Sequence, residues 1–162
     1  MIYKRFKMSP KGENGFTLIE LIVVVIITGV LAVAVIPRFV DKQTFEARGF
    51  YDQALAMLRY AQKVAIAQRT TVFVNADAVS NKLCLTYVAD ANCTNLTGVL
   101  NPADQTKFSK TAPSGITFSA SVAFSFSPLG KPNPDAAVSL NIVGDGMTRT
   151  ITVERETGYV HS

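Results

Sequence analysis

One apolar segment constrains this chain more than any other feature. Residues 16–36 read FTLIELIVVVIITGVLAVAVI, and Glu20 is their single ionisable residue. As an α-helix, these residues extend about 31 Å, close to the hydrocarbon thickness of a bilayer. A carboxylate inside a spanning helix costs a few kcal/mol and marks a functional site by default. The segment therefore predicts one membrane-spanning helix with a functional carboxylate near its start.

The flanking residues set the orientation of that helix. The first 15 residues hold four basic residues and one acidic residue: Lys4, Arg5, Lys7, Lys11 and Glu13. Because positive charge stays on the cytoplasmic side, we expect the N-terminus in the cytoplasm and residues 38–162 outside it. A cleaved secretory signal has a shorter apolar core and a small-residue cleavage site, whereas here Pro37 follows the segment directly.

Residues 41–70 predict a continuation of the helix. Apolar residues recur at steps of three and four, the spacing of one buried helix face. They are Ala47, Tyr51, Ala54, Leu58, Ala61 and Ala65. Pro37 lies between the two halves, and we expect a helix bend there because proline removes a backbone hydrogen bond.

After Arg69 the pattern changes to the alternation of half-buried strands. Strands are predicted at 71–75, 82–88, 116–119, 122–127, 138–143, 147–154 and 159–161. Gly144-Asp145-Gly146 predicts a hairpin turn, and residues 89–115 predict an irregular loop. The expected fold class is α+β, with a long N-terminal helix packed on an antiparallel β-sheet domain.

Two cysteines and one histidine limit the chemistry. Cys84, Cys93 and His161 are too few soft ligands for a zinc site. In an exported domain an even cysteine pair is most simply a disulfide, with two free thiols as the alternative. No nucleophile with a base and an orienting group is evident, so we expect no enzyme activity, metal or cofactor.

The formal net charge of +4 raises the question of nucleic-acid binding. Most of the excess lies in the first 15 residues, beside the apolar segment, where a topogenic role explains it. Five later basic residues could form a patch: Lys107, Lys110, Lys131, Arg149 and Arg155. Glu154 and Glu156 flank Arg155, which argues against a nucleic-acid partner.

The junction before the apolar segment resembles the leader of type IV pilins and type II secretion pseudopilins. Residues 11–20 read KGENGFTLIE, after a short basic stretch. The resemblance implies that a prepilin peptidase cleaves between Gly15 and Phe16 and methylates the new amine of Phe16. Glu20 lies about one helical turn from that amine, so it can pair with the Phe16 amine of a neighbouring subunit during assembly. Pro37 falls where many pilins carry a helix-bending proline.

The C-terminal part resembles the GspH/FimT-like minor pilins, including those of the mannose-sensitive haemagglutinin system. The resemblance rests on LRYAQKVAIAQR at 58–69, FSPLG at 126–130 and GYV at 158–160. It implies a cleaved leader (1–15), a transmembrane and filament-core helix (16–37), an amphipathic continuation (38–70) and an exported β domain (71–162). Implied partners are prepilin peptidase, other filament subunits and the inner-membrane assembly platform.

Two functions remain open at this point. The first is a minor pilin or pseudopilin, held in the bacterial inner membrane by a single pass with its C-terminal domain in the periplasm. Such a subunit joins or primes a type IV pilus or a type II secretion pseudopilus. The second is a membrane-tethered module that binds DNA, a surface or an exported substrate. The sequence does not distinguish a pilus subunit from a pseudopilus subunit, because both carry the same kind of leader and helix.

Overall fold

The computed structural model describes residues 16–94 and 97–162, without the side chains of 33–41. The chain divides into two compact units, Met1–Arg38 and Phe39–Ser162. Helix α1 (Leu18–Gln68) contains residues of both units. Pro37 lies within α1, but its side chain is not described, so the bend expected there stays a prediction.

The strands that follow α1 in the described chain all pair antiparallel. They are β1 (Val72–Asp77), β2 (Lys82–Thr86), β3 (Ser109–Thr111), β4 (Thr117–Phe118), β5 (Val122–Phe126), β6 (Pro132–Asn133), β7 (Val138–Gly144), β8 (Met147–Val153) and β9 (Val160–His161). The strands predicted from alternation are confirmed, with bounds shifted by up to two residues. Strands β3 and β6 were not predicted.

The expected α+β class, a long helix packed on antiparallel strands, is confirmed, and the strands form two sheets. Their orders are β3-β2-β1-β5-β6 and β4-β7-β8-β9. The first sheet ends at β6, where Pro132 and Pro134 cannot donate a backbone hydrogen bond to a further strand. The chain then leaves that edge and starts a second ladder at β7.

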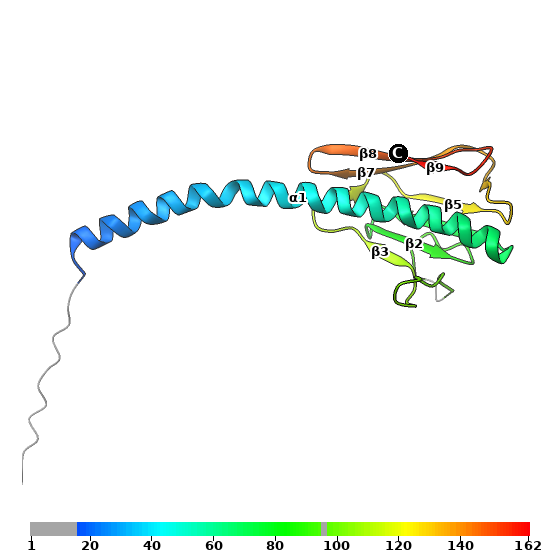
Figure 1. Cartoon of the computed structure of the whole chain (residues 1–162), viewed down its shortest axis with the longest axis horizontal. Helices are drawn as coiled ribbons and strands as arrows, with labels where there is room; N and C mark the ends of the chain where they lie inside the picture. Colours follow the sequence, from blue (N-terminus) through cyan, green and yellow to red (C-terminus); the bar gives the residue numbers. More distant parts are fainter. Residues whose placement is uncertain (1–15, 95–96) are drawn as a thin grey trace, which may run out of the picture. The chain divides into compact units, whose positions relative to one another are not determined.

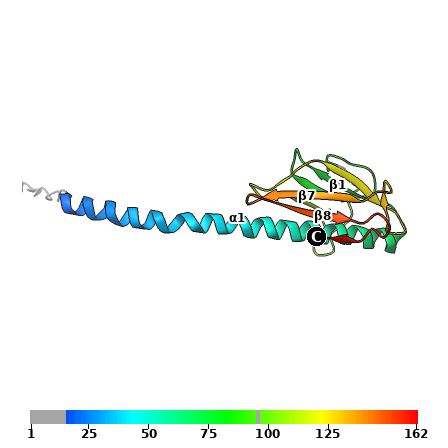
Figure 2. The same cartoon turned by 90° about the horizontal axis from the view of Figure 1, so that it is seen from above.

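The second half of α1 packs along the sheets (Figures 1 and 2). Of its predicted apolar face, Ala47, Ala54, Leu58, Ala61 and Ala65 are buried, and Tyr51 is partly buried. Phe50, Met57 and Val64 are buried as well, so the buried stripe is wider than predicted. Tilted ring contact between Phe50 and Phe118 of β4 joins the helix to the second sheet.

The hairpin between β7 and β8 has the predicted turn. Gly144 pairs with Met147, and the two residues between them, Asp145 and Gly146, have φ of 51° and 76°. Positive φ at both central positions gives a turn whose twist matches the flanking strands. This explains why an Asp-Gly pair stands at this position.

Candidate functional site

Phe16 and Thr17 directly precede α1, and Glu20 lies in its first turn. The backbone N–H of Glu20 donates to the carbonyl oxygen of Thr17 at 3.1 Å and to its hydroxyl oxygen at 3.3 Å. Thr17 is therefore the N-cap of the helix, and Glu20 is its third residue. The Thr-x-x-Glu spacing of a capping box was readable in the sequence, but the cap was not predicted. Gly15 lies outside the described residues.

The side chains that follow this cap form an apolar surface without cover. Phe16 is 81% exposed. The large apolar side chains from Leu18 to Leu31 are also exposed, each by more than two-fifths of its surface. A helix that is apolar on all sides is stable when lipid or other protein segments cover it. Glu20 is exposed on the same surface, and it is the acidic residue of the first turn, where the helix dipole favours negative charge.

Thr28 is the other hydrogen-bonding side chain on this surface. Its hydroxyl donates within the helix, to the carbonyl oxygens of Val24 at 2.8 Å or Val25 at 3.0 Å. A hydroxyl satisfied in this way tolerates an apolar environment. Glu20 is then the one side chain between residues 18 and 32 whose charge still requires an external partner.

Within residues 16–32, 42–94 and 97–162, no helix combines the length and the apolarity needed to cross a membrane.

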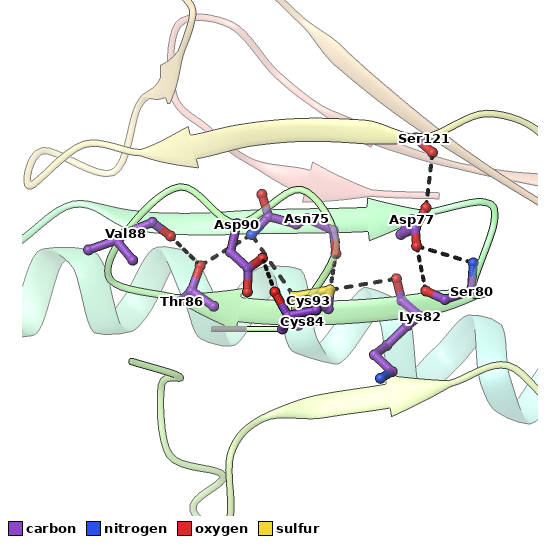
Figure 3. The surroundings of a disulfide bond; sticks show 11 residues. Asn75, Asp77, Ser80, Lys82, Cys84, Thr86, Val88, Asp90, Cys93 and Ser121 are labelled. Atoms are coloured by element: carbon purple, nitrogen blue, oxygen red, sulfur yellow. Dashed lines mark hydrogen bonds between the residues drawn. A yellow bond between two sulfur atoms is a disulfide. The ribbon is translucent and has the colours of Figure 1, made fainter. Parts of the chain in front are cut away.

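Cys84 and Cys93 form the predicted disulfide. Cys84 lies in β2, Cys93 lies in the following loop, and their Cα atoms are 5.7 Å apart. The bond fastens the loop against the outer face of the five-stranded sheet, where Asn75 and Thr86 are buried (Figure 3). Asn75 Nδ2 donates to Thr86 Oγ1 at 3.2 Å, and Thr86 Oγ1 donates to the carbonyl of Val88 at 2.7 Å.

Asp77 organises the turn at the other end of the same face (Figure 3). Its carboxylate accepts hydrogen bonds from the Ser80 hydroxyl and from the backbone N–H groups of Val79 and Ser80. These bonds, led by that of the Ser80 hydroxyl, hold the pKa of Asp77 below its ordinary value of 3.8. The residue is an ionised structural group rather than a candidate acid.

Three of the five basic residues that could form a nucleic-acid patch form ion pairs with acidic side chains. Arg149 pairs with Asp145 at 2.8 Å and Arg155 with Asp135 at 3.1 Å, while Lys131 lies 3.6 Å from Glu156. These acids therefore offset much of the positive charge on this part of the domain.

His161 lies at the end of β9, against β8. Its Nε2 is 2.9 Å from the Glu154 carboxylate, and its ring stacks on Tyr159 with centroids 5.6 Å apart. Hydrogen bonds to the backbone oxygen of Ser162 and to Glu154 raise the pKa of His161 above its ordinary 6.5. In the described part of the chain, no three His, Cys, Asp or Glu side chains are placed to hold a metal ion.

The chain matches known proteins in both of its parts. Residues 10–36 match the prokaryotic N-terminal methylation motif. The type IV narrow pilus major component PilA5 of Thermus thermophilus is 41% identical over 55 residues, which are 34% of this chain. The match spans 47% of the length of that pilin.

A solved minor pilin shares the fold at low identity. The type IV minor pilin FimU of Pseudomonas aeruginosa PAO1 superposes with a TM-score of 0.51 at 18% identity, over 75% of this chain and 87% of FimU. The minor pseudopilin EpsH of the Vibrio cholerae type 2 secretion system gives a TM-score of 0.49 at 16% identity, over 74% and 94%.

The family of the folded domain follows from a longer match. Residues 52–158 match the family described as type II transport protein GspH, and these residues include part of the helix, strands β1 to β8 and the disulfide. The chain belongs to the GspH family and carries a prepilin-type N-terminal methylation motif.

Proposed function

We propose that this chain is a minor pilin or pseudopilin, a structural subunit that joins or primes a type IV pilus or a type II secretion pseudopilus. The observation that carries the proposal is the uncovered apolar surface of α1 with a single carboxylate in its first turn. Membership of the GspH family and the methylation motif support it. The similarity to PilA5 covers part of that protein and supports the same class of subunit.

In the proposed function, the subunit is first held in the membrane and is then assembled into the filament. Prepilin peptidase removes residues 1–15 on the cytoplasmic side and methylates the amine of Phe16. Residues 16–37 then hold the protein in the inner membrane by a single pass, with residues 71–162 in the periplasm. Finally the assembly platform moves the subunit into the filament, where neighbouring helices surround the apolar surface. The apolar length of residues 16–36 and the hydroxyl of Thr28 bonded within the helix support both stages.

Glu20 is the proposed recognition group for assembly. A bundle of apolar helices is a medium of low dielectric, where an unpaired carboxylate is costly. The amine of Phe16 on a neighbouring subunit supplies the opposite charge, and Glu20 lies one turn along the helix from its own Phe16. Thr17 already caps the helix through the backbone N–H of Glu20, so the carboxylate is not required for that cap.

Glu20→Ala tests the proposal. The variant should be cleaved and should insert in the membrane, because the change removes the only ionisable side chain of the apolar segment. It should enter sheared filaments poorly, because loss of one side of a buried ion pair costs roughly 3–5 kcal/mol. Glu46→Ala is the matched control. It removes another α1 carboxylate, one that lies 3.5 Å from Lys42 outside the apolar segment, and it should assemble normally.

A processed Glu20→Ala protein that reaches filaments at wild-type levels would refute the pairing. The carboxylate would then serve only the helix dipole or extend to the nearby membrane interface.

A further inference from the structure

The outer face of the five-stranded sheet carries a cavity of about 320 Å³ that the proposed function does not use. In β1, Val72 and Val74 face the core, so Phe73 and Asn75 face the opposite side. The register places Phe73 beside Ser125 of β5, and Asn75 beside Ala123. These four residues form the floor of the cavity.

Two segments form its walls. One consists of Ala89, Asp90 and Ala91, in the loop that the Cys84–Cys93 disulfide fastens to β2. The other is Asn133 with Pro134, and Asn133 is the strand partner of Ser125. Among the described residues, no lysine or arginine lines the cavity, so it suits a neutral group better than an anion.

Ser125 supplies a polar group that the fold leaves unused. The residue is only 2% exposed and lines the cavity. Among the described residues its hydroxyl has no hydrogen-bond partner, whereas the amide of Asn75 bonds to Thr86. In the part of the chain that the structure describes, Asn81 Oδ1 is the one fully buried side-chain N or O atom without a hydrogen-bond partner. The Ser125 hydroxyl is therefore open to the cavity and available to a group that enters it.

The cavity adjoins an open sheet edge. Strand β6 pairs only with Ser125 and Phe126, so Val122–Phe124 of β5 have no strand neighbour on that side among the described residues. Ala123 and Phe124 also line the cavity. An open edge with a side-chain pocket beside it is the arrangement by which sheets bind extended peptides.

We propose that the open edge of β5 and this cavity together form a docking site for an extended segment of a partner protein. The segment pairs with Val122–Phe124 through its backbone and places one aromatic side chain beside Phe73. A tyrosine fits the chemistry best, because its ring meets Phe73 and the methyl groups of Ala89, Ala91 and Ala123, and its hydroxyl can bond to Ser125. The cavity is at the small end of ligand pockets, which suits one large side chain.

Labelled peptides test the site on the processed full chain in lipid nanodiscs. The probe is fluorescein-labelled Thr-Val-Tyr-Val-Thr, with empty nanodiscs as the blank and fluorescence anisotropy as the readout. Versions with central alanine, or with N-methylated peptide bonds that cannot pair with a strand, should bind at least about tenfold more weakly. Absence of saturable binding above the blank overturns the proposal, and so does equal binding of the N-methylated peptide.

Two variants locate the binding. Ala123 is exposed on β5, so Ala123→Phe fills the cavity and should weaken binding about tenfold. Thr148→Phe makes a comparable change at an exposed position of β8 and should leave binding unaltered. Ser125→Ala should abolish the preference for the tyrosine peptide over its phenylalanine counterpart without weakening the latter. Wild-type binding by Ala123→Phe, or a retained tyrosine preference in Ser125→Ala, contradicts the site.

Discussion

The carboxylate of Asp145 accepts hydrogen bonds from both terminal nitrogens of Arg149, at 2.8 Å and 2.9 Å. Asp145 lies in the β7–β8 turn and Arg149 in β8, and their side chains are 8% and 16% exposed. Thr44 of α1 also donates a hydrogen bond to Asp145. A bidentate pair fixes orientation as well as charge, so this carboxylate joins the hairpin to the helix.

Acid should weaken the domain through this pair. The hydrogen bonds from Arg149, together with the charges of Arg149 and Arg48, hold the pKa of Asp145 below its ordinary 3.8. Because the folded pKa is the lower one, the contribution to stability is present above about pH 4 and is lost as the pH falls through the folded value. Asp145→Asn should lower the free energy of unfolding at pH 7 and flatten its decline in acid.

Urea unfolding followed by tyrosine fluorescence at pH 7 and at about pH 3 measures this effect. Asp135→Asn is the control, because its pair with Arg155 is exposed and screened by water. An equal loss in both variants would contradict the structural role of the Asp145 pair.

Gly158 should not tolerate a side chain. A Cβ at this position would lie 1.9 Å from the carbonyl oxygen of Gly130, and φ is +64°. Gln62 Nε2 donates to the carbonyls of Gly130 and Thr157 at this junction, so neither segment can shift freely. Gly158→Ala should cost roughly 2–4 kcal/mol of unfolding free energy, from backbone strain and the clash together.

Gly146→Ala separates the two contributions. Gly146 has a similar φ of +76°, but nothing lies within 4 Å of its added Cβ. The variant should cost about 1–2 kcal/mol, the strain of a left-handed residue alone. Equal urea midpoints for the two variants would show that the Gly130 contact is not tight.

The spacing of apolar residues predicted much of this fold. Side chains return to the same face every two residues in a strand and every 3.6 residues in a helix, so the buried face of each element recurs in the sequence. Ala54, Leu58 and Ala61 repeat along α1, and Leu140 and Ile142 alternate in β7; all are buried. β6 was missed because Pro132 and Asn133 are too short a segment to show alternation. β3 was missed because it is a strand only through pairing with β2, which is distant in the sequence; Lys82, for example, pairs with Thr111.

The candidate sites also differ in whether their residues are close together in the sequence. Phe16 and Glu20 were recognisable because their proposed roles depend on neighbours along one short segment. The Asp145–Arg149 pair, the junction at Gly158 and the cavity beside Phe73 depend on segments that meet only after folding. A pattern within one segment carries no information about those contacts.

The disulfide should stabilise the exported domain without affecting membrane insertion. Cys84 and Cys93 are separated by nine positions, and closing a ring of this size contributes on the order of 2–3 kcal/mol by the loop-entropy relation. Replacing both cysteines with serine should lower the free energy of unfolding by that amount. Non-reducing peptide mapping should recover the two cysteines as one linked species; alkylation of both without reduction would contradict the bond.

His161 should titrate above its ordinary value. Its protonated ring donates to the backbone oxygen of Ser162 and to Glu154, and both bonds raise the pKa above 6.5. The stabilising contribution is complete below about pH 6.5 and is lost as the pH rises through the folded pKa. An NMR titration should show this, and Glu154→Gln should move the pKa downward. A wild-type value at or below 6.5 would contradict the contacts.

We propose that this chain is processed as a prepilin and keeps its apolar helix. Mass spectrometry can test this on the N-terminal peptide taken from membranes and from sheared filaments of cells that make the protein. We expect a peptide that begins at Phe16 with a methylated amine, in both fractions. A peptide that begins at Met1, or one that begins after Ile36, would contradict it.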